Sequence, residues 1–264
     1  MKNAEIFSIL EKMAPKAYQE EYDNAGIISG SYSAECTGAL ITLDVTDSVV
    51  DEAIAMKYNL IIAHHPLIFK GLKKIIPGNA VSDPLIKAIK NDITIYAIHT
   101  NLDNVSSGVN RKLCEVLGIQ NCKILVPGIG KLSKLITYTP MAHAAKVREA
   151  LFEAGAGQIG NFDSCSFNSP GEGTFRAGEN TNPFVGEKGA VHTENETRTE
   201  VVFPTHMAQK VIHTLIKAHP YEEVAYDIYS LENCHPEVGS GMTGELGKPM
   251  KAMDFLSFVK EKLN

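Results

Sequence analysis

Two adjacent histidines, His64 and His65, and a later carboxylate, Asp103, have the residue types and spacing of a metal-binding set. The histidines directly follow the apolar run at residues 59–63, and Pro66 comes next, so the strand predicted there ends where they begin. Adjacent side chains on a regular strand point to opposite faces, and both imidazoles reach one site only where the strand is ending. Imidazole and carboxylate ligands in this combination suit Zn, Mn, Fe or Ni.

The histidine pair alone also fits another interpretation, with one core histidine and one surface histidine. Asp103 favours the metal interpretation, because it follows a second predicted strand and a carboxylate there can bridge two ions. His99 comes shortly before Asp103. It is either part of the metal site, as a further ligand or an outer partner, or simply a hydrogen-bonded histidine at a strand end. Asp44 ends another strand, where it either orients a histidine or caps the helix expected to start near Thr46, which is the favoured interpretation.

A centre of this kind would serve hydrolysis, although the sequence identifies no catalytic residue beyond the ligands. A metal ion lowers the pKa of a bound water to about 7, which yields hydroxide at neutral pH. Two ions about 3.5–4 Å apart hold the nucleophile and the leaving oxygen together. This chemistry suits a phosphoester, an amide-like bond or a C–N bond of a purine ring, and the ligands alone do not choose among them.

The elements that must position these residues are predicted from apolar patterns in the first half of the chain. In chain order they are a helix ending near residues 14–15, a strand at 38–44, a helix at 46–57, a strand at 59–63, a helix at 81–91, a strand at 93–98 and a helix at 108–117. Strand–helix–strand order implies right-handed parallel crossovers. Because ligands bind at the carboxyl ends of parallel strands, we expect the histidines and carboxylates at one edge of a mostly parallel, three-layer sheet domain.

The pattern of predicted helices and strands changes after residues 128–130. The elements predicted there are a strand at 131–138, a helix at 141–154 that starts at Thr139-Pro140, a strand at 158–167, a long loop at 168–198, a strand at 199–203, a helix at 205–217 and a strand at 222–231. This βαβ–βαβ order is that of a ferredoxin-like α+β domain. A metal-binding α/β domain of residues 1–125 and 233–264 is therefore interrupted by a ferredoxin-like insert at 126–232. The chain ends on a helix whose Met253, Leu256 and Val259 are expected to face inward.

The composition of the 264 residues is that of an ordinary globular protein, with 44% hydrophobic and 21% charged residues. A formal charge of −6 without a Lys/Arg run disfavours a nucleic-acid partner. The five cysteines are odd in number and form no CxxC pair, which predicts reduced thiols and a cytoplasmic location. No apolar run reaches the roughly 18 residues of a membrane span, so no membrane association is expected.

Three motifs resemble the GTP cyclohydrolase I type 2 homologue family, also called the NGG-interacting-factor-three-like family. They are Asp-Asn-Ala-Gly at 23–26, Ala-His-His-Pro-Leu-Ile-Phe at 63–69 and His-Thr-Asn-Leu-Asp at 99–103. Residues 241–246 look like the family's return into its main domain. The segments Gly-Thr-Phe-Arg at 173–176 and His-Pro-Tyr-Glu-Glu at 219–223 resemble the family's optional insert, which is similar to CutA and nitrogen-regulator folds.

The resemblance implies a dinuclear centre with His64, His65 and Asp103 as ligands to two divalent ions per subunit, inside a toroidal homohexamer. It also implies a metal-dependent, hydrolase-like protein with a small-molecule or nucleotide substrate, and GTP cyclohydrolase activity is claimed for some family members. A phosphoesterase with the same dinuclear centre remains an alternative. A non-catalytic regulatory or binding protein with a protein partner is another, because the insert fold is often used for assembly and sensing.

The family completes its centre with a further carboxyl-terminal segment that supplies a His and a Glu in His-x-x-x-Glu spacing. This sequence ends at Asn264 before any such segment, so we expect a metal-binding domain and a centre that are incomplete at this end. The pairs His192/Glu196 and His219/Glu223 have the spacing, but they lie in the predicted insert and are not accepted as replacements.

Overall fold

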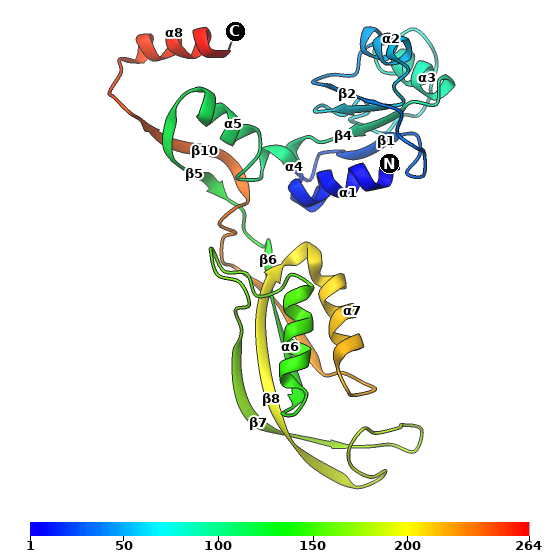
Figure 1. The fold of residues 1–264 in the computed structure, drawn as a ribbon, viewed down its shortest axis with the longest axis vertical. Helices are drawn as coiled ribbons and strands as arrows, with labels where there is room; N and C mark the ends of the chain where they lie inside the picture. The colour runs from blue at the N-terminus through cyan, green and yellow to red at the C-terminus, as the bar shows by residue number, and fades with distance from the viewer. Residues whose placement is uncertain (264) are drawn as a thin grey trace. The chain divides into compact units, whose positions relative to one another are not determined.

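The computed structural model describes residues 1–263, which form two compact units (Figure 1). The first unit comprises Met1–Val126 and the segment that begins at Glu237, and the second comprises Pro127–Pro236. Each unit has a buried apolar core of its own. None of the helices formed by residues 1–263 combines the length and the apolar character needed to cross a membrane.

The first unit contains a four-stranded sheet with helices on both faces. Its elements are α1 (Asn3–Met13), a 3-10 turn (Lys16–Tyr18), β1 (Gly26–Ser29), β2 (Ala39–Thr42), α2 (Asp47–Met56), β3 (Leu60–Ala63), α3 (Ser82–Lys90), β4 (Thr94–Ala97), α4 (Thr100–Asp103), α5 (Val109–Val116), β5 (Ile119–Pro127), β10 (Gly239–Leu246) and α8 (Ala252–Leu263). The strand order is β1-β4-β3-β2, with β2, β3 and β4 parallel and β1 antiparallel to β4. The predicted mostly parallel α/β sheet is thereby confirmed, while β1 and β5 were not predicted.

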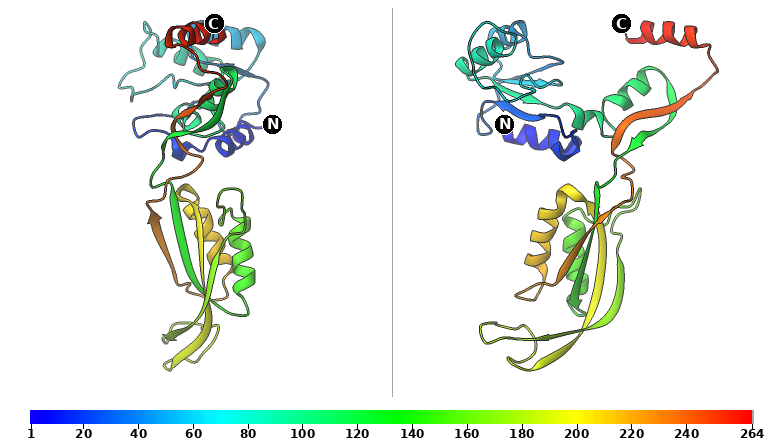
Figure 2. Two further views of the ribbon diagram at one scale, coloured as in Figure 1. Left: turned by 90° about the vertical axis from the view of Figure 1, so that its left-hand side faces the viewer. Right: turned by 180° about the vertical axis from the view of Figure 1, so that it is seen from behind.

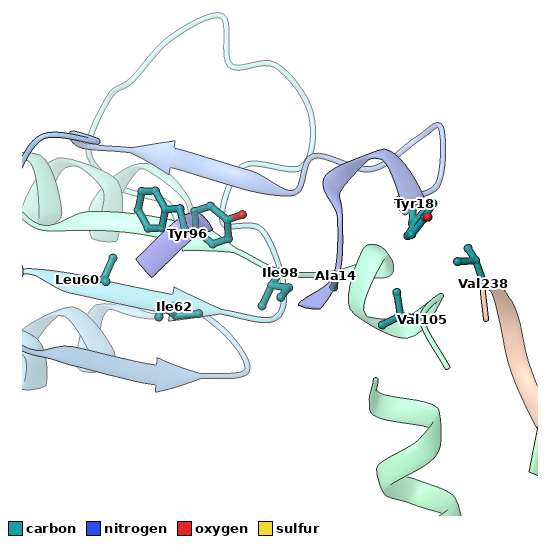
Figure 3. Close-up of a cluster of buried hydrophobic side chains, with 9 residues drawn as sticks. Ala14, Tyr18, Leu60, Ile62, Tyr96, Ile98, Val105 and Val238 are labelled. Atoms are coloured by element: carbon teal, nitrogen blue, oxygen red, sulfur yellow. The ribbon is translucent and has the colours of Figure 1, made fainter. Parts of the chain in front are cut away.

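Alternate residues of the central strands define the three layers. Leu60 and Ile62 of β3 pack with Phe7 of α1, whose ring stacks on Tyr96 of β4 at 4.3 Å between centroids (Figure 3). The opposite face is covered by α2 and α3, and its cluster comprises Val45, Val50, Ala53, Ile61, Ala63, Ala88, Ile93 and Ile95. All four residues of β3 and all four of β4 are buried. Both strands therefore lie in the middle of the sheet, as their unbroken apolar runs indicate.

The chain re-enters the first unit at β10, which pairs with β5 in a separate two-stranded sheet. Val238 forms a bridge with Val105, and both side chains belong to the cluster shown in Figure 3. The prediction that the last helix turns its apolar side inward is wrong for the described residues. No side chain of α8 is buried, and Met253 is 72% exposed, because apolar spacing along a helix does not by itself supply a surface to pack against.

The second unit has the predicted ferredoxin-like topology. Its elements are β6 (Leu132–Pro140), α6 (Ala144–Glu153), β7 (Phe167–Arg176), β8 (Val191–Pro204), a 3-10 turn (Thr205–Met207), α7 (Ala208–Ala218) and β9 (Tyr226–Leu231). The antiparallel strand order is β7-β8-β6-β9, and α6 and α7 cover one face (Figure 2). The core between helices and sheet comprises Leu135, Val147, Leu151, Ala154, Ala156, Val201, Phe203, Val211 and Leu215.

The predicted strand at 158–167 and the predicted long loop at 168–198 are wrong. β7 and β8 instead form a long hairpin, paired from Phe167 opposite Glu200 to Arg176 opposite Val191. Most side chains of β7 are exposed, so its residues need no apolar alternation, and the ladder of backbone hydrogen bonds forms regardless of their polarity. Pro170 is tolerated because β7 is an edge strand.

The predicted helix start at Thr139-Pro140 is also wrong. β6 continues through both residues, and Thr139 is fully buried opposite Thr197 of β8. The helix begins only at Ala144, after His143. A buried position in the central ladder therefore outweighs the local capping signal of a Thr-Pro pair.

Truncation of Leu215 to alanine tests the core of the second unit. Leu215 is fully buried, and its neighbour on α7, Ile216, is 50% exposed. We expect Leu215→Ala to lower the free energy of unfolding by about 2–5 kcal/mol, and Ile216→Ala to change it far less. Urea unfolding followed by circular dichroism measures both, and equal losses would show that α7 does not pack as described.

Candidate metal centre

Three histidines meet at the carboxyl ends of β3 and β4. The ring centroids of His64, His65 and His99 lie 5.1, 5.2 and 5.4 Å apart in pairs. One ring nitrogen from each lies within 4.8 Å of the other two. Of residues 1–263, these three histidines form the one cluster of His, Cys, Asp and Glu side chains whose donor atoms meet closely enough to hold an ion.

His64 and His65 converge because regular strand geometry stops at Ala63. Their backbone N–H groups still donate to the carbonyls of Thr42, the last residue of β2, and of Leu43, which follows it, at 3.0 and 2.9 Å. The two ring planes are inclined by 46°, and the rings lie next to each other. Adjacent side chains of a regular strand would lie on opposite faces of the sheet. The predicted end of the strand before Pro66 is thus what brings both rings to one place.

Each of the three imidazoles has an acceptor behind it, at Nδ1. The Nδ1 of His64 lies 2.9 Å from the carbonyl oxygen of Ile98, that of His65 lies 2.8 Å from Asp44, and that of His99 lies 2.7 Å from Asp23. An acceptor at this position makes Nδ1 the protonated nitrogen of a neutral ring and leaves the Nε2 lone pair free. The three Nε2 atoms are therefore available to one ion, and their outer partners fix the orientation of the rings.

Asp23 is held as a carboxylate although its side chain is 0% exposed. Burial alone would raise the pKa of this group. Hydrogen bonds from His99, from the hydroxyl and N–H groups of Thr100, and from the N–H group of Asn24 outweigh burial and lower the pKa below its usual value. A fully charged acceptor strengthens the His99 ring as an electron-pair donor. Asp23 was not among the predicted site residues, and the signal for it is the Asp-Asn-Ala-Gly motif before β1.

Asp103 lies beside His64, one of the three imidazoles. It ends α4, and its Oδ1 is 3.7 Å from the Nε2 of His64. That separation is too long for a direct hydrogen bond. Two bonds of about 2.1 Å from a nitrogen and an oxygen to one ion place the two donors roughly 3–4 Å apart, which matches the observed distance.

Asp44 acts on His65 and does not cap a helix. Its carboxylate accepts the His65 hydrogen bond, while Thr46 is the residue whose side chain accepts from the Val49 N–H at the start of α2. The favoured interpretation of Asp44 as a cap is therefore wrong, and its alternative, the orientation of a histidine, is what the geometry shows. Every residue predicted for the site, whether as ligand or as outer partner, lies at this one edge of the sheet.

The residues present fit a divalent metal ion. Three imidazoles whose Nδ1 atoms face acceptors, with one carboxylate beside His64, make a donor set typical of Zn and of related transition metals. The carbonyl and carboxylate partners behind the rings complete the arrangement that metal-binding histidines usually show. His65 is 46% exposed at its side chain, so the site is open to a ligand from solvent.

Known proteins resemble this chain over its whole length. The family profile of Duf34/NIF3 (NGG1p interacting factor 3) matches residues 1–264. The GTP cyclohydrolase 1 type 2 homolog of Bacillus subtilis is 42% identical over 261 residues, which are 98% of this chain and 70% of that protein. The homolog of the same name in Listeria monocytogenes is 38% identical over 258 residues, with 97% and 69% covered.

Two solved structures extend the similarity to the fold. A Bacillus cereus protein related to NIF3 has a TM-score of 0.85 and 43% identity, covering 100% of this chain and 70% of the other. Staphylococcus aureus protein SA1388 has a TM-score of 0.73 and 31% identity, covering 100% and 69%. Both similarities include the two units described above.

Removal of one imidazole should weaken metal binding strongly. Loss of an outer partner lowers metal affinity about 10–100-fold. We expect His64→Ala and His99→Ala each to lower the affinity for Zn²⁺ by more than this. His213, which is exposed on α7, provides the matched control, His213→Ala. Isothermal titration of the purified chain with Zn²⁺ measures the three affinities, and indistinguishable values would contradict the proposed ligand set.

The acceptors behind the rings can be tested without touching a ligand. Asp23→Asn and Asp44→Asn keep the side-chain shape but remove the charge that holds Nδ1 protonated, so Zn²⁺ affinity should fall about 10–100-fold. Asp92→Asn is the control, because Asp92 is exposed in a turn with positive φ that asparagine tolerates. Unchanged affinity in both site variants would show that the rings are oriented by other contacts.

Proposed function

This chain belongs to the Duf34/NIF3 family, and on that basis we propose that it is a metal-dependent hydrolase acting on a nucleotide such as GTP. The name of its Bacillus subtilis relative, GTP cyclohydrolase 1 type 2 homolog, supports this choice of substrate. The site would be the edge of the first unit where His64, His65, His99 and Asp103 meet.

One observation carries the proposal. One ring nitrogen of each imidazole lies within 4.8 Å of the other two, and each Nδ1 lies within 2.9 Å of an acceptor, which supports Nε2 as the nitrogen offered to an ion. Histidines with a purely structural role use both nitrogens for hydrogen bonds within the protein, as His219 does with Tyr138 and Tyr221. The remaining ring nitrogens at this edge of the sheet therefore support an occupant that accepts electron pairs, as a metal cation does.

The roles of the chain's own residues follow from this geometry. His64, His65 and His99 would hold the ion through Nε2, and Asp103 would contribute a carboxylate oxygen beside His64. Asp44 and Asp23 keep the rings from rotating and keep their protons on Nδ1. A divalent ion bound there would supply a Lewis acid that polarises the substrate and activates water.

Two aromatic side chains beside the histidines favour a planar substrate. The Phe69 ring lies 6.2 Å from that of His99, and the Tyr22 ring lies 6.2 Å from that of Phe69. Phe69 is 44% exposed and Tyr22 is 65% exposed. Exposed rings next to the centre offer a stacking surface to a nucleobase, which a simple phosphomonoester would not need.

The test is formate release from GTP by the chain loaded with Zn²⁺ or Mn²⁺. We expect turnover that falls about 100-fold or more in His64→Ala, as electrostatic contributions of this kind usually do. Phe69→Ala should raise KM roughly 5–100-fold, which corresponds to the loss of one stacking contact. The control Asp92→Asn should leave both constants unchanged.

The outcomes separate this proposal from its rivals. Turnover of phosphomonoesters or diesters, with no formate from GTP, would assign the centre to a phosphoesterase. If the chain binds metal tightly and turns over neither class, the proposal fails and a non-catalytic binding role takes its place.

A further inference from the structure

A second candidate site lies wholly within the second unit, where the His-Pro-Tyr-Glu-Glu and Gly-Thr-Phe-Arg segments meet. A cavity of about 290 Å³ opens between the end of β7, the loop that follows it and the turn between α7 and β9. Its lining includes Gly173, Phe175, Arg176, Phe184, Glu196 and Tyr221. The volume is near the lower end of the range of about 300–1,000 Å³ that is usual for small-molecule pockets.

Glu196 on β8 is the charge that this cavity surrounds. The residue is only 8% exposed, and no cation pairs with it among residues 1–263. Gly173 faces it across the hairpin, and a Cβ at that position would lie 2.2 Å from the Oε2 of Glu196. The bare backbone of Gly173 therefore makes room for the carboxylate. A buried carboxylate without a cationic partner is unfavourable, so this arrangement is expected to persist only where a ligand compensates for it.

Tyr221 presents a second unsatisfied group. Its hydroxyl oxygen is buried and accepts no hydrogen bond among residues 1–263, and the Glu196 carboxylate is the group that lies against the phenol. Burial first, and then the nearby carboxylates of Glu196 and Glu194, raise the pKa of Tyr221. The phenol is therefore neutral, and its oxygen can accept a hydrogen bond from a ligand.

Aromatic rings form the walls of the cavity. The Tyr221 ring centroid lies 6.0 Å from that of Phe175 and 6.2 Å from that of Phe184. The loop that carries Phe184 is tied to the turn by a hydrogen bond of 2.7 Å from the Asn182 N–H to Glu222. Ring faces around a carboxylate attract a cation, because the π-electron quadrupole adds to the charge of the carboxylate.

The remaining charges select against an anion. Glu222 and Glu223 are exposed in the lining, where Arg176 is the one positively charged side chain. Three carboxylates thus outnumber a single guanidinium, and the phosphate groups of a nucleotide would be repelled.

A metal ion does not fit this cavity as well as an organic cation does. Both nitrogens of His219 are already occupied, at 2.9 Å by the carbonyl of Tyr138 and at 3.1 Å by the N–H of Tyr221. His192 is paired with Glu194 at 3.0 Å. Within residues 1–263, no cluster of metal-binding side chains includes a residue of this cavity.

We propose that this cavity binds a small organic cation whose ammonium or guanidinium group pairs with Glu196 and is enclosed by the rings of Phe175, Phe184 and Tyr221. The Tyr221 oxygen accepts one N–H hydrogen bond of the ligand. The site is separate from the histidine cluster of the first unit and does not depend on the function proposed for that cluster.

Isothermal titration of the whole chain with agmatine, putrescine and ethanolamine tests the proposal. At least one of these cations should bind saturably, and EDTA should not change its affinity. Glu196→Gln, which keeps the shape of the side chain, should weaken binding at least tenfold. Glu149→Gln, at an exposed position on α6, should leave the affinity unchanged.

A second readout does not depend on the choice of probe. Because Glu196→Gln removes a buried charge that no cation of residues 1–263 neutralises, the ligand-free variant should have a melting temperature equal to or above that of the unchanged protein. The proposal is overturned if none of the three cations binds, if their binding survives Glu196→Gln, or if AMP binds in the same cavity in their place. A marked fall in the melting temperature of Glu196→Gln would equally contradict it, since Glu196 would then have a structural partner.

Discussion

The first unit depends on hydrogen bonds that act behind three imidazole rings. Each ring has one nitrogen turned toward an acceptor, which is a backbone carbonyl for His64 and a carboxylate for His65 and His99. These bonds determine both the direction in which each ring points and the nitrogen that carries its proton. Without them, three histidines at a sheet edge would be free to rotate into solvent. With them, one ring nitrogen of each histidine stays within 4.8 Å of the other two.

The parallel sheet supplies the framework for this arrangement. β3 and β4 are neighbours and parallel, so the residues that follow them reach the same edge. Asp44 follows β2, the next strand, and so stands beside His65. Asp23 comes from the loop before β1, which is antiparallel to β4 and therefore enters the sheet from the same end. The charged groups of the site thus come from four strand ends, and the buried apolar strands between them keep these ends in register.

Much of this arrangement can be predicted from the sequence, because its signals are local. The apolar runs before His64 and His99 indicate buried strands, and parallel connections then place the histidines together. The partner of His99 cannot be predicted in the same way, because Asp23 is distant in the sequence and its contact depends on the tertiary fold. The β7–β8 hairpin was missed for a related reason. Its residues are polar and mostly exposed. Its ladder is stabilised by backbone hydrogen bonds, which require no apolar pattern in the side chains.

The two candidate sites use buried carboxylates in opposite ways. Asp23 has imidazole, hydroxyl and backbone partners that compensate for its burial, so it serves to orient another residue. Glu196 has no cationic partner among the described residues of the second unit and lines a cavity, so it is suited to meet a ligand.

The central claim, that the Nε2 atoms of the first unit hold a metal, is tested most directly by anomalous X-ray scattering at the Zn and Mn edges on crystals of this chain. The account predicts an anomalous peak about 2.1 Å from the Nε2 atoms of at least two of the three histidines, with their Nδ1 atoms still bonded to Ile98, Asp44 and Asp23. Well-ordered rings with no peak between them, in crystals grown with either metal, would contradict it.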